Sequence, residues 1–149
     1  DAKVWLDDFE GEPQVNCEKL LSQVDGATAH IAGYSYESKR RANVMLANTL
    51  AHVLKLEEPK AYQMPKPEIE STTLGKVENL DLDLIRRLVF SVYDVRRDSL
   101  MFKNCFKDAK SFDAMRSNYR ERRELSSLHL LNVEDKFKEQ LSLLGFSVD

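Results

Sequence analysis

The strongest periodic pattern in the chain lies between Ser38 and Leu56. Apolar residues recur there at intervals of about four, which predicts a long helix with one apolar stripe. The residues of this stripe are Ala42, Leu46, Leu50 and Val53-Leu54. Lys39, Arg40 and Arg41 fall in the first turns, where an exposed cation opposes the helix macrodipole by about 0.3–1 kcal/mol. This cost predicts an anionic partner near the start of the helix, a role that Glu37 would fill in part.

Short elements and loops precede this helix. Lys3 to Leu6 is a brief apolar run that contains Val and Trp, as at the end of a buried strand. Two acids interrupt the run, and Gly11 with Pro13 then predicts a loop, because Pro cannot continue a strand ladder. Glu18 to Val24 carries apolar residues at helical spacing and ends at the turn-forming pair Asp25-Gly26.

The segment from Glu57 to Lys76 holds three of the four prolines and has little periodicity. It predicts a linker, and with it a division into residues 1–57 and residues 58–149. Strands and helices alternate beyond it, which predicts an α+β or α/β layer. The predicted strands span 69–74, 128–133 and 146–148. Three helices are predicted: one that starts at about Asp81, with an acid as N-cap, a second over 111–123 and a third over 134–144. Gly145 is predicted to end the third helix.

The composition is that of an ordinary globular protein, with 42% hydrophobic and 32% charged residues among 149. A net charge of -3 gives no general attraction to nucleic acid or to an anionic membrane, and no apolar run approaches the roughly 20 residues that span a bilayer. Cys17 and Cys105 lie far apart without CxxC spacing, so we expect no disulfide, no metal site and a reducing cytoplasm. The chain lacks an initiating Met and opens almost directly on a strand-like run, which we interpret as a truncated beginning.

A candidate for proton transfer is formed by Glu12, on the first loop, and His30, on a second loop ahead of the long helix. Histidine is the usual general base near neutral pH, and a carboxylate on its far ring nitrogen fixes the tautomer and raises its basicity. On spacing alone, a structural loop histidine and a solvated acid are the favoured interpretation. Gly33, three residues on, permits close backbone approach.

The remaining histidines and a group of arginines are open to plainer interpretations. His52 falls on the polar side of the long helix and His129 inside a predicted strand, so we expect both to be structural. The arginines could bind nucleic acid, bind a substrate phosphate across a subunit boundary, or form ion pairs at a surface or interface. They are Arg116, Arg120, Arg122 and Arg123. Acidic neighbours and the negative net charge make nucleic acid the weakest of the three.

Two motifs together resemble a known family. Asp7-Asp8-Phe9-Glu10-Gly11-Glu12-Pro13 followed by His30-Ile31-Ala32-Gly33-Tyr34 resembles the closing active-site motifs of the D-isomer-specific 2-hydroxyacid dehydrogenases. The segments 92–98 and 118–128 narrow the resemblance to one member, which acts on a phosphorylated sugar acid. The resemblance implies an α/β chain: the end of a Rossmann-like nucleotide-binding domain, then a small α+β C-terminal dimerisation domain.

The resemblance also implies roles for single residues. His30 would exchange a proton with the substrate hydroxyl, and Glu12 would be its partner carboxylate. Asp7 and Gly33 would contact the cofactor, NAD, and Tyr34 the substrate. A homodimer formed through the C-terminal domain is implied as well.

The chain departs from the family pattern in ways that limit what it could do alone. It contains no GxGxxG phosphate loop, and the family's substrate-binding arginine would precede the Asp7 strand. Ala29 and Leu125 stand where the family often has Pro and Trp. Two hypotheses follow: the chain is the C-terminal part of a dehydrogenase, inactive as a fragment, or it is a self-association module without catalytic activity.

Overall fold

The computed structural model describes residues 2–16, 18–57, 59 and 63–149, and these residues form two compact units. The first unit combines the chain up to Tyr34 with Asp94–Arg120, and the second combines Ser35–Tyr93 with Glu121–Asp149. Each unit is therefore made from two separate stretches of chain. The predicted division after residue 57 falls at Glu58, outside the described residues, and stays a prediction. Cys17 also lies outside them, and Cys105 is an exposed free thiol.

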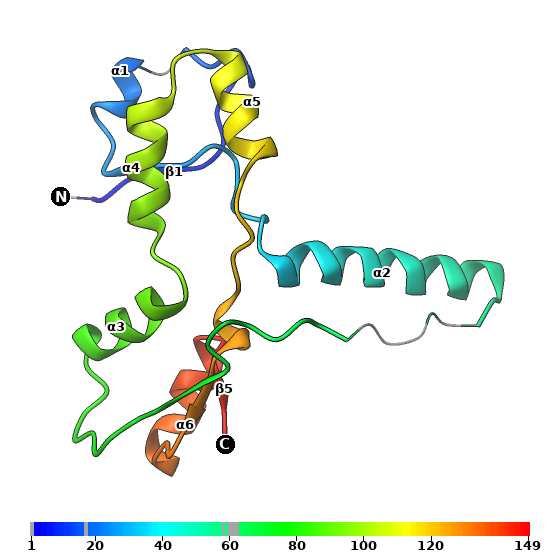
Figure 1. Ribbon diagram of the computed structural model, residues 1–149, viewed down its shortest axis with the longest axis vertical. Coiled ribbons are helices and arrows are strands. Elements are labelled where there is room, and N and C mark those ends of the chain that lie inside the picture. The colour runs from blue at the N-terminus through cyan, green and yellow to red at the C-terminus, as the bar shows by residue number, and fades with distance from the viewer. Residues whose placement is uncertain (1, 17, 58, 60–62) are drawn as a thin grey trace. The chain divides into compact units, whose positions relative to one another are not determined.

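The first unit contains a pair of parallel strands and three helices (Figure 1). Strand β1 (Trp5–Leu6) pairs with β2 (Gly26–Ala27), with Trp5 opposite Gly26 and Leu6 opposite Ala27. Any side chain at position 26 would meet the Trp5 ring, because a Cβ there would lie 2.2 Å from it. The helices are α1 (Glu18–Leu21), α4 (Val95–Cys105) and α5 (Ala109–Ser117).

Aromatic side chains form the core of the first unit. Phe9 lies in the loop after β1, Phe102 on α4 and Phe112 on α5, and all three are buried. Their ring centroids are 5.6 to 6.4 Å apart at inclined or edge-to-face angles, the arrangement that aromatic pairs prefer. The buried small residues Ala27 and Ala29 let the β2 segment approach this cluster. The loop that follows β1 is thus anchored to two helices more than 90 residues further along the chain.

Two helices of this unit differ from the sequence prediction. Helix α4 was not predicted as a separate element; it starts because the Asp94 side chain accepts a hydrogen bond from the Arg96 N–H. The helix predicted over 111–123 instead spans Ala109–Ser117, so its predicted second half is wrong. A reciprocal capping box between Asp108 and Ser111 fixes its start.

The second unit contains a three-stranded parallel sheet in the order β3-β4-β5, which confirms the predicted α/β class. Its strands are β3 (Ser71–Thr73), β4 (His129–Leu131) and β5 (Ser147–Val148). Its helices are α2 (Tyr36–Leu54), α3 (Leu82–Val92), the short 3-10 turn η1 (Leu125–Ser127) and α6 (Asp135–Leu143). Buried apolar side chains of α3, β4 and α6, among them Leu88, Leu130 and Leu141, form its core.

Two predicted helix boundaries in this unit are confirmed. Asp81 is the N-cap of α3, and its carboxylate accepts a hydrogen bond of 2.8 Å from the Leu84 N–H. Gly145 follows α6 with a φ of 103°, in the left-handed region where glycine costs least. Local capping chemistry therefore sets these boundaries much as the sequence indicated.

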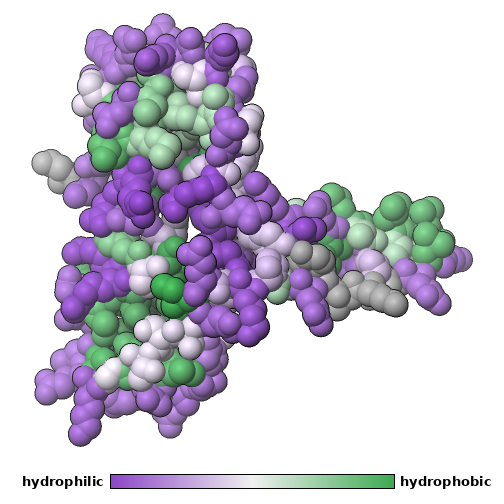
Figure 2. Space-filling model, in the orientation of Figure 1, coloured by the Kyte–Doolittle hydropathy of each residue, from purple (hydrophilic) through white to green (hydrophobic). Residues whose placement is uncertain are grey.

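The long helix α2 is present as predicted, but its apolar stripe is exposed. Only Glu37 and Ala51 are buried on it, whereas Leu46, Leu50 and Val53 are 57 to 70% exposed. Figure 2 shows hydrophobic side chains gathered over the C-terminal half of the helix. No helix in the described part of the chain is long and apolar enough to cross a membrane.

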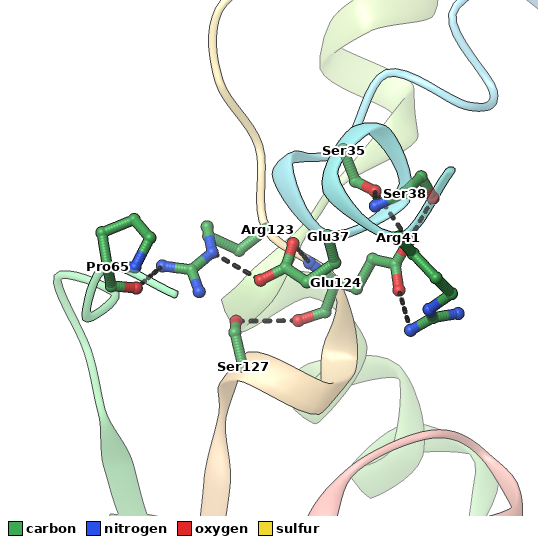
Figure 3. A network of polar contacts seen from close by, with 8 residues as sticks. All are labelled: Ser35, Glu37, Ser38, Arg41, Pro65, Arg123, Glu124 and Ser127. Atoms are coloured by element: carbon green, nitrogen blue, oxygen red, sulfur yellow. Dashed lines mark hydrogen bonds and ion pairs between the residues drawn. The ribbon is translucent and has the colours of Figure 1, made fainter. Parts of the chain in front are cut away.

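Figure 3 shows the polar network that holds the start of α2 within the second unit. Ser35 caps the helix by accepting from the Ser38 N–H, and both hydroxyls donate to the Glu124 carboxylate. The buried carboxylate of Glu37 receives the Arg123 Nε–H at 2.6 Å. Arg41 approaches Glu124 at 3.7 Å, so this cation in the first turns of the helix has an anionic partner, as predicted. Glu124 lies in the segment just before η1, far from α2 along the chain. The sequence around α2 therefore could not identify it as the partner.

Candidate active site

The two parallel strands of the first unit end side by side, and a carboxylate follows one of them directly. Asp7 comes after β1, and Thr28 after β2. The Asp7 carboxylate accepts three hydrogen bonds, from the Thr28 hydroxyl at 2.5 Å and from the backbone N–H groups of Ile31 and Ala32 at 2.8 and 2.9 Å. It therefore holds the chain on both sides of His30. Crevices at the carboxyl ends of parallel strands are where α/β proteins usually bind ligands.

His30 has an unusual backbone conformation within this loop. Its φ is 53°, a left-handed value that costs a residue with a Cβ about 1–2 kcal/mol. The neighbours Ala29 and Ile31 are buried, and Asp7 bonds the backbone directly after it. These contacts compensate for the strain. The ring itself is 43% exposed and so is presented to the surroundings rather than packed in the core.

Glu12 supports the imidazole from the first loop. One carboxylate oxygen accepts the Phe9 N–H at 2.8 Å, and the other lies 2.7 Å from Nδ1 of His30. An ionised carboxylate can only accept, so Nδ1 carries the proton of the neutral ring and Nε2 presents a lone pair. Among the described residues no hydrogen-bond partner is found for Nε2. The arrangement is that of a general base with its free nitrogen turned away from its supporting acid.

The charges around His30 favour its protonated form. The hydrogen bond to Glu12 raises the pKa of His30 above the ordinary value of 6.5. Burial acts against this shift, the charges of Glu12 and Asp8 add to it, and the positive charge of Arg116 opposes it. Asp8 lies 3.5 Å from Nδ1 but is 77% exposed, so its effect is strongly screened.

The same three side chains could be considered as a metal site. Asp8, Glu12 and His30 offer donor atoms within 4.8 Å of one another. Glu12 and Nδ1 are already at hydrogen-bond distance, and exposed acids form such groups commonly without an ion. We interpret the group as an imidazole supported by carboxylates and assign no metal to it.

Gly33 and Tyr34 complete the loop. A Cβ at Gly33 would meet no atom within 4 Å, so the space beside it is open. The Tyr34 N–H donates to the Ile31 carbonyl, which closes a turn directly after His30. The Tyr34 ring lies edge-to-face against Tyr119, with centroids 6.0 Å apart, and beneath the Arg116 guanidinium.

The structure thus brings all five predicted site residues into one loop system of the first unit. It adds two residues to which no role in this loop system was assigned from the sequence, Asp8 and Arg116. Asp8 could have been found from its place beside Asp7 on the loop that also carries Glu12. The contact of Arg116 with Tyr34 joins residues 82 positions apart and has no signal in a single sequence.

The other two histidines have ordinary surroundings. His129 uses both ring nitrogens near the end of the chain, Nδ1 with the Ser147 hydroxyl at 2.8 Å and Nε2 with Asp149 at 2.7 Å. His52 is exposed on α2. Neither lies in the loop system around His30.

The fold and this loop system define an α/β protein with a histidine–carboxylate pair at the carboxyl ends of two parallel strands. Residues 63–145 match the family described as a domain of unknown function (DUF3410), and the chain belongs to that family. The matched range lies wholly outside the His30 loops, so this family by itself says nothing about them.

Similarity to particular proteins extends over nearly the whole chain. The chain is 38% identical over 146 residues to the erythronate-4-phosphate dehydrogenase of Pectobacterium carotovorum subsp. carotovorum, covering 97% of this chain and 38% of that relative. It is 42% identical over 149 residues to the enzyme of the same name from Aeromonas salmonicida, covering 98% and 38%. The Escherichia coli relative of that name is 39% identical over 146 residues, covering 97% and 38%.

These relatives confirm the resemblance that the motifs indicated, down to the single family member. The similarity fits the C-terminal portion of that dehydrogenase. The chain spans less than two fifths of the length of the curated relatives it matches.

Proposed function

We propose that the chain is the C-terminal part of an NAD-dependent dehydrogenase that oxidises 4-phospho-D-erythronate at its 2-hydroxyl, a step in vitamin B6 synthesis. The observation that carries the proposal is the 2.7 Å contact between Glu12 and Nδ1 of His30, on loops held by Asp7. The names of the relatives supply the substrate, and the geometry supplies a base suited to a hydroxyl proton. Residues 1–57 would belong to the end of the Rossmann-like domain, and residues 58–149 to a dimerisation domain.

The proton-transfer step follows from the tautomer of His30. In the oxidation the C2–H bond gives up a hydride, the O–H bond gives up a proton, and a carbonyl forms at C2. The lone pair on Nε2 takes the hydroxyl proton, and Glu12 stabilises the resulting imidazolium through Nδ1. Such general-base assistance contributes about 10²–10⁴-fold to a rate. In the reverse reduction the imidazolium returns the proton.

Asp7 and Gly33 are suited to contact the nicotinamide end of NAD. The sequence contains no GxGxxG loop for the pyrophosphate of the cofactor. Within the described residues, one Asp7 oxygen accepts from the Ala32 N–H alone and so retains acceptor capacity, and the space beside Gly33 is open. These two residues would hold the carboxamide end, and the nicotinamide when bound would accept the hydride. Tyr34, on the same loop, would contact the substrate.

A complete protein of the relatives' length is the proper test material. It should reduce NAD when supplied with 4-phosphoerythronate, and the 149-residue chain alone should show no turnover, because it has no phosphate loop. Failure of the complete protein to reduce NAD, or turnover by the fragment, would contradict the proposal. NADH absorbance measures both.

A further inference from the structure

Four arginines lie between positions 116 and 123, and three of them have partners within their own unit. Arg123 is bonded to Glu37, Arg122 stacks over Tyr93 at 4.3 Å, and Arg120 lies 3.8 Å from Asp98. Arg116 differs from these three: no ion pair to it is found among the described residues. The contacts of Arg120, Arg122 and Arg123 therefore explain those three positive charges, whereas the charge of Arg116 needs another explanation.

Arg116 lies in the loop system of His30. Its Cζ is 5.6 Å from the centroid of the Tyr34 ring, a cation–π contact with the residue four positions after His30. Its Nε is completely buried and has no hydrogen-bond partner within the described residues. A buried donor without a partner is costly, so native structures that retain one generally have a use for it. The positive charge also reaches His30, whose pKa it lowers.

The surroundings of Arg116 are held in place by a buried acid. Tyr119 packs edge-to-face on Tyr34, and its hydroxyl donates to Asp98 at 2.5 Å. Asp98 is only 6% exposed and lies on α4, the helix that carries Phe102 into the core. The two tyrosines are thus fixed before any ligand arrives, and the guanidinium stacked on Tyr34 is oriented with them. Such preorganisation favours recognition of a defined group.

We propose that Arg116, stacked on Tyr34 beside the His30–Glu12 pair, binds the phosphate group of the phosphorylated 2-hydroxy acid. This inference rests on the proposed function. A guanidinium presents a planar fork of donors that matches phosphate oxygens, and no ion pair within the described residues competes with them for the Arg116 charge. All the residues involved belong to the first unit.

The position of Arg116 favours the phosphate over the carboxylate of the same substrate. The carboxylate is bonded to the reacting carbon and must lie against His30 itself. Arg116 instead lies over the ring of Tyr34, further along the loop. Because Arg116 lies away from the imidazole, it is suited to bind the phosphate, which is at the opposite end of the four-carbon substrate from the carboxylate.

The test compares Arg116→Gln with the unchanged protein at full length, using 4-phosphoerythronate and unphosphorylated erythronate. Loss of charged hydrogen bonds should lower kcat/KM for the phosphorylated substrate about 10- to 100-fold, mainly through KM. The value for erythronate should change less than about threefold, within the range of ordinary surface effects. Arg87→Gln, which removes an exposed ion pair with Asp83 on α3, is the control and should leave both values unchanged.

Arg116→Lys keeps the charge and tests the case in which Arg116→Gln fails to fold. Lysine lacks the fork, so an intermediate loss confined to the phosphorylated substrate is expected. An equal loss with both substrates, or no loss with either, would overturn the assignment of Arg116 and leave the proposed function intact. If the unchanged protein oxidises neither substrate, the proposed function itself fails.

Discussion

At the scale of single residues, the site depends on one strained backbone position held by one acid. His30 adopts a φ of 53°, and Asp7 bonds the backbone and the Thr28 side chain around it. Sequence motifs predicted Asp7 as a cofactor contact. That contact stays a prediction, whereas the structure shows that the Asp7 carboxylate organises the histidine loop. The hydrogen bonds of Asp7 therefore fix the backbone of the loop and, with it, the position of the His30 imidazole.

The pKa of His30 gives a prediction with a definite sign. Oxidation needs the neutral ring, so the rate should fall as the pH drops through that pKa, which lies above 6.5 because of the Glu12 hydrogen bond. Glu12→Gln removes the largest cause of the rise, so the acid limb of kcat/KM should move to lower pH. The maximal rate should also fall, by about 10-fold or more, because the amide stabilises an imidazolium less well than a carboxylate does.

The reverse reaction gives an internal check on that prediction. Reduction needs the protonated ring, so its rate should fall as the pH rises through the same pKa. Asp8→Asn is the matched control, because Asp8 is largely exposed and contributes less. An acid limb that stays in place in Glu12→Gln would contradict the role given to Glu12.

At the scale of elements, the start of α2 depends on long-range polar contacts. Glu37 is 8% exposed, and its carboxylate accepts from Arg123 Nε and from the Glu124 N–H. Burial acts to raise the pKa of Glu124, but hydrogen bonds from Ser35 and Ser38, with nearby arginine charges, outweigh it and lower that pKa. This contribution to stability is present above the ordinary value of 4.5 and is lost as the pH falls through the lowered pKa.

Breaking the Glu37–Arg123 pair should loosen the helix start. Arg123→Met leaves a largely buried carboxylate without its cation, which we expect to cost about 2–3 kcal/mol, somewhat below a fully buried pair. Hydrogen exchange at the first-turn amides of α2 should speed up accordingly. Arg87→Met removes an exposed ion pair with Asp83 and is the control, with an expected change below about 0.5 kcal/mol. Equal exchange in the two variants would contradict this account.

Some elements could be predicted from the sequence and others could not, for identifiable reasons. Helix α2 has a clear period, and α3 and α6 have local boundary signals in Asp81 and Gly145. Helix α4 was missed although Asp94 is a local N-cap signal, because two of its three buried residues, Asp98 and Ser99, are polar and a search for apolar periodicity does not mark them. The 111–123 prediction was too long because the apolar spacing continued past Ser117, where the chain leaves the helix.

For the whole molecule, the α/β class and the pairing of Glu12 with His30 could be predicted from the sequence, but the composition of the two units could not. Each unit combines stretches far apart in the chain, and only tertiary packing decides which belong together. The exposure of Leu46 and Leu50 likewise could not be seen from periodicity, which shows that a helix is amphipathic but not what it packs on.

Self-association through the C-terminal domain is proposed at this scale. A domain of about this size is expected to bury only a modest share of its surface. The second unit, which contains most of residues 58–149, has a three-stranded sheet with edges that a partner strand could cover. We expect light scattering of the complete protein at micromolar concentration to give the mass of a dimer. A monomer mass would count against the dimerisation domain and would leave the proton-transfer pair unaffected.

The central claim is that His30 transfers the hydroxyl proton, and His30→Ala in the complete protein tests it most directly. Turnover of 4-phosphoerythronate should fall about 10²–10⁴-fold, because the general base is removed. NAD affinity measured by titration should stay nearly constant, because the hydrogen bonds of Asp7 use the backbone of this loop and not the imidazole. Near-normal turnover in His30→Ala would contradict the claim.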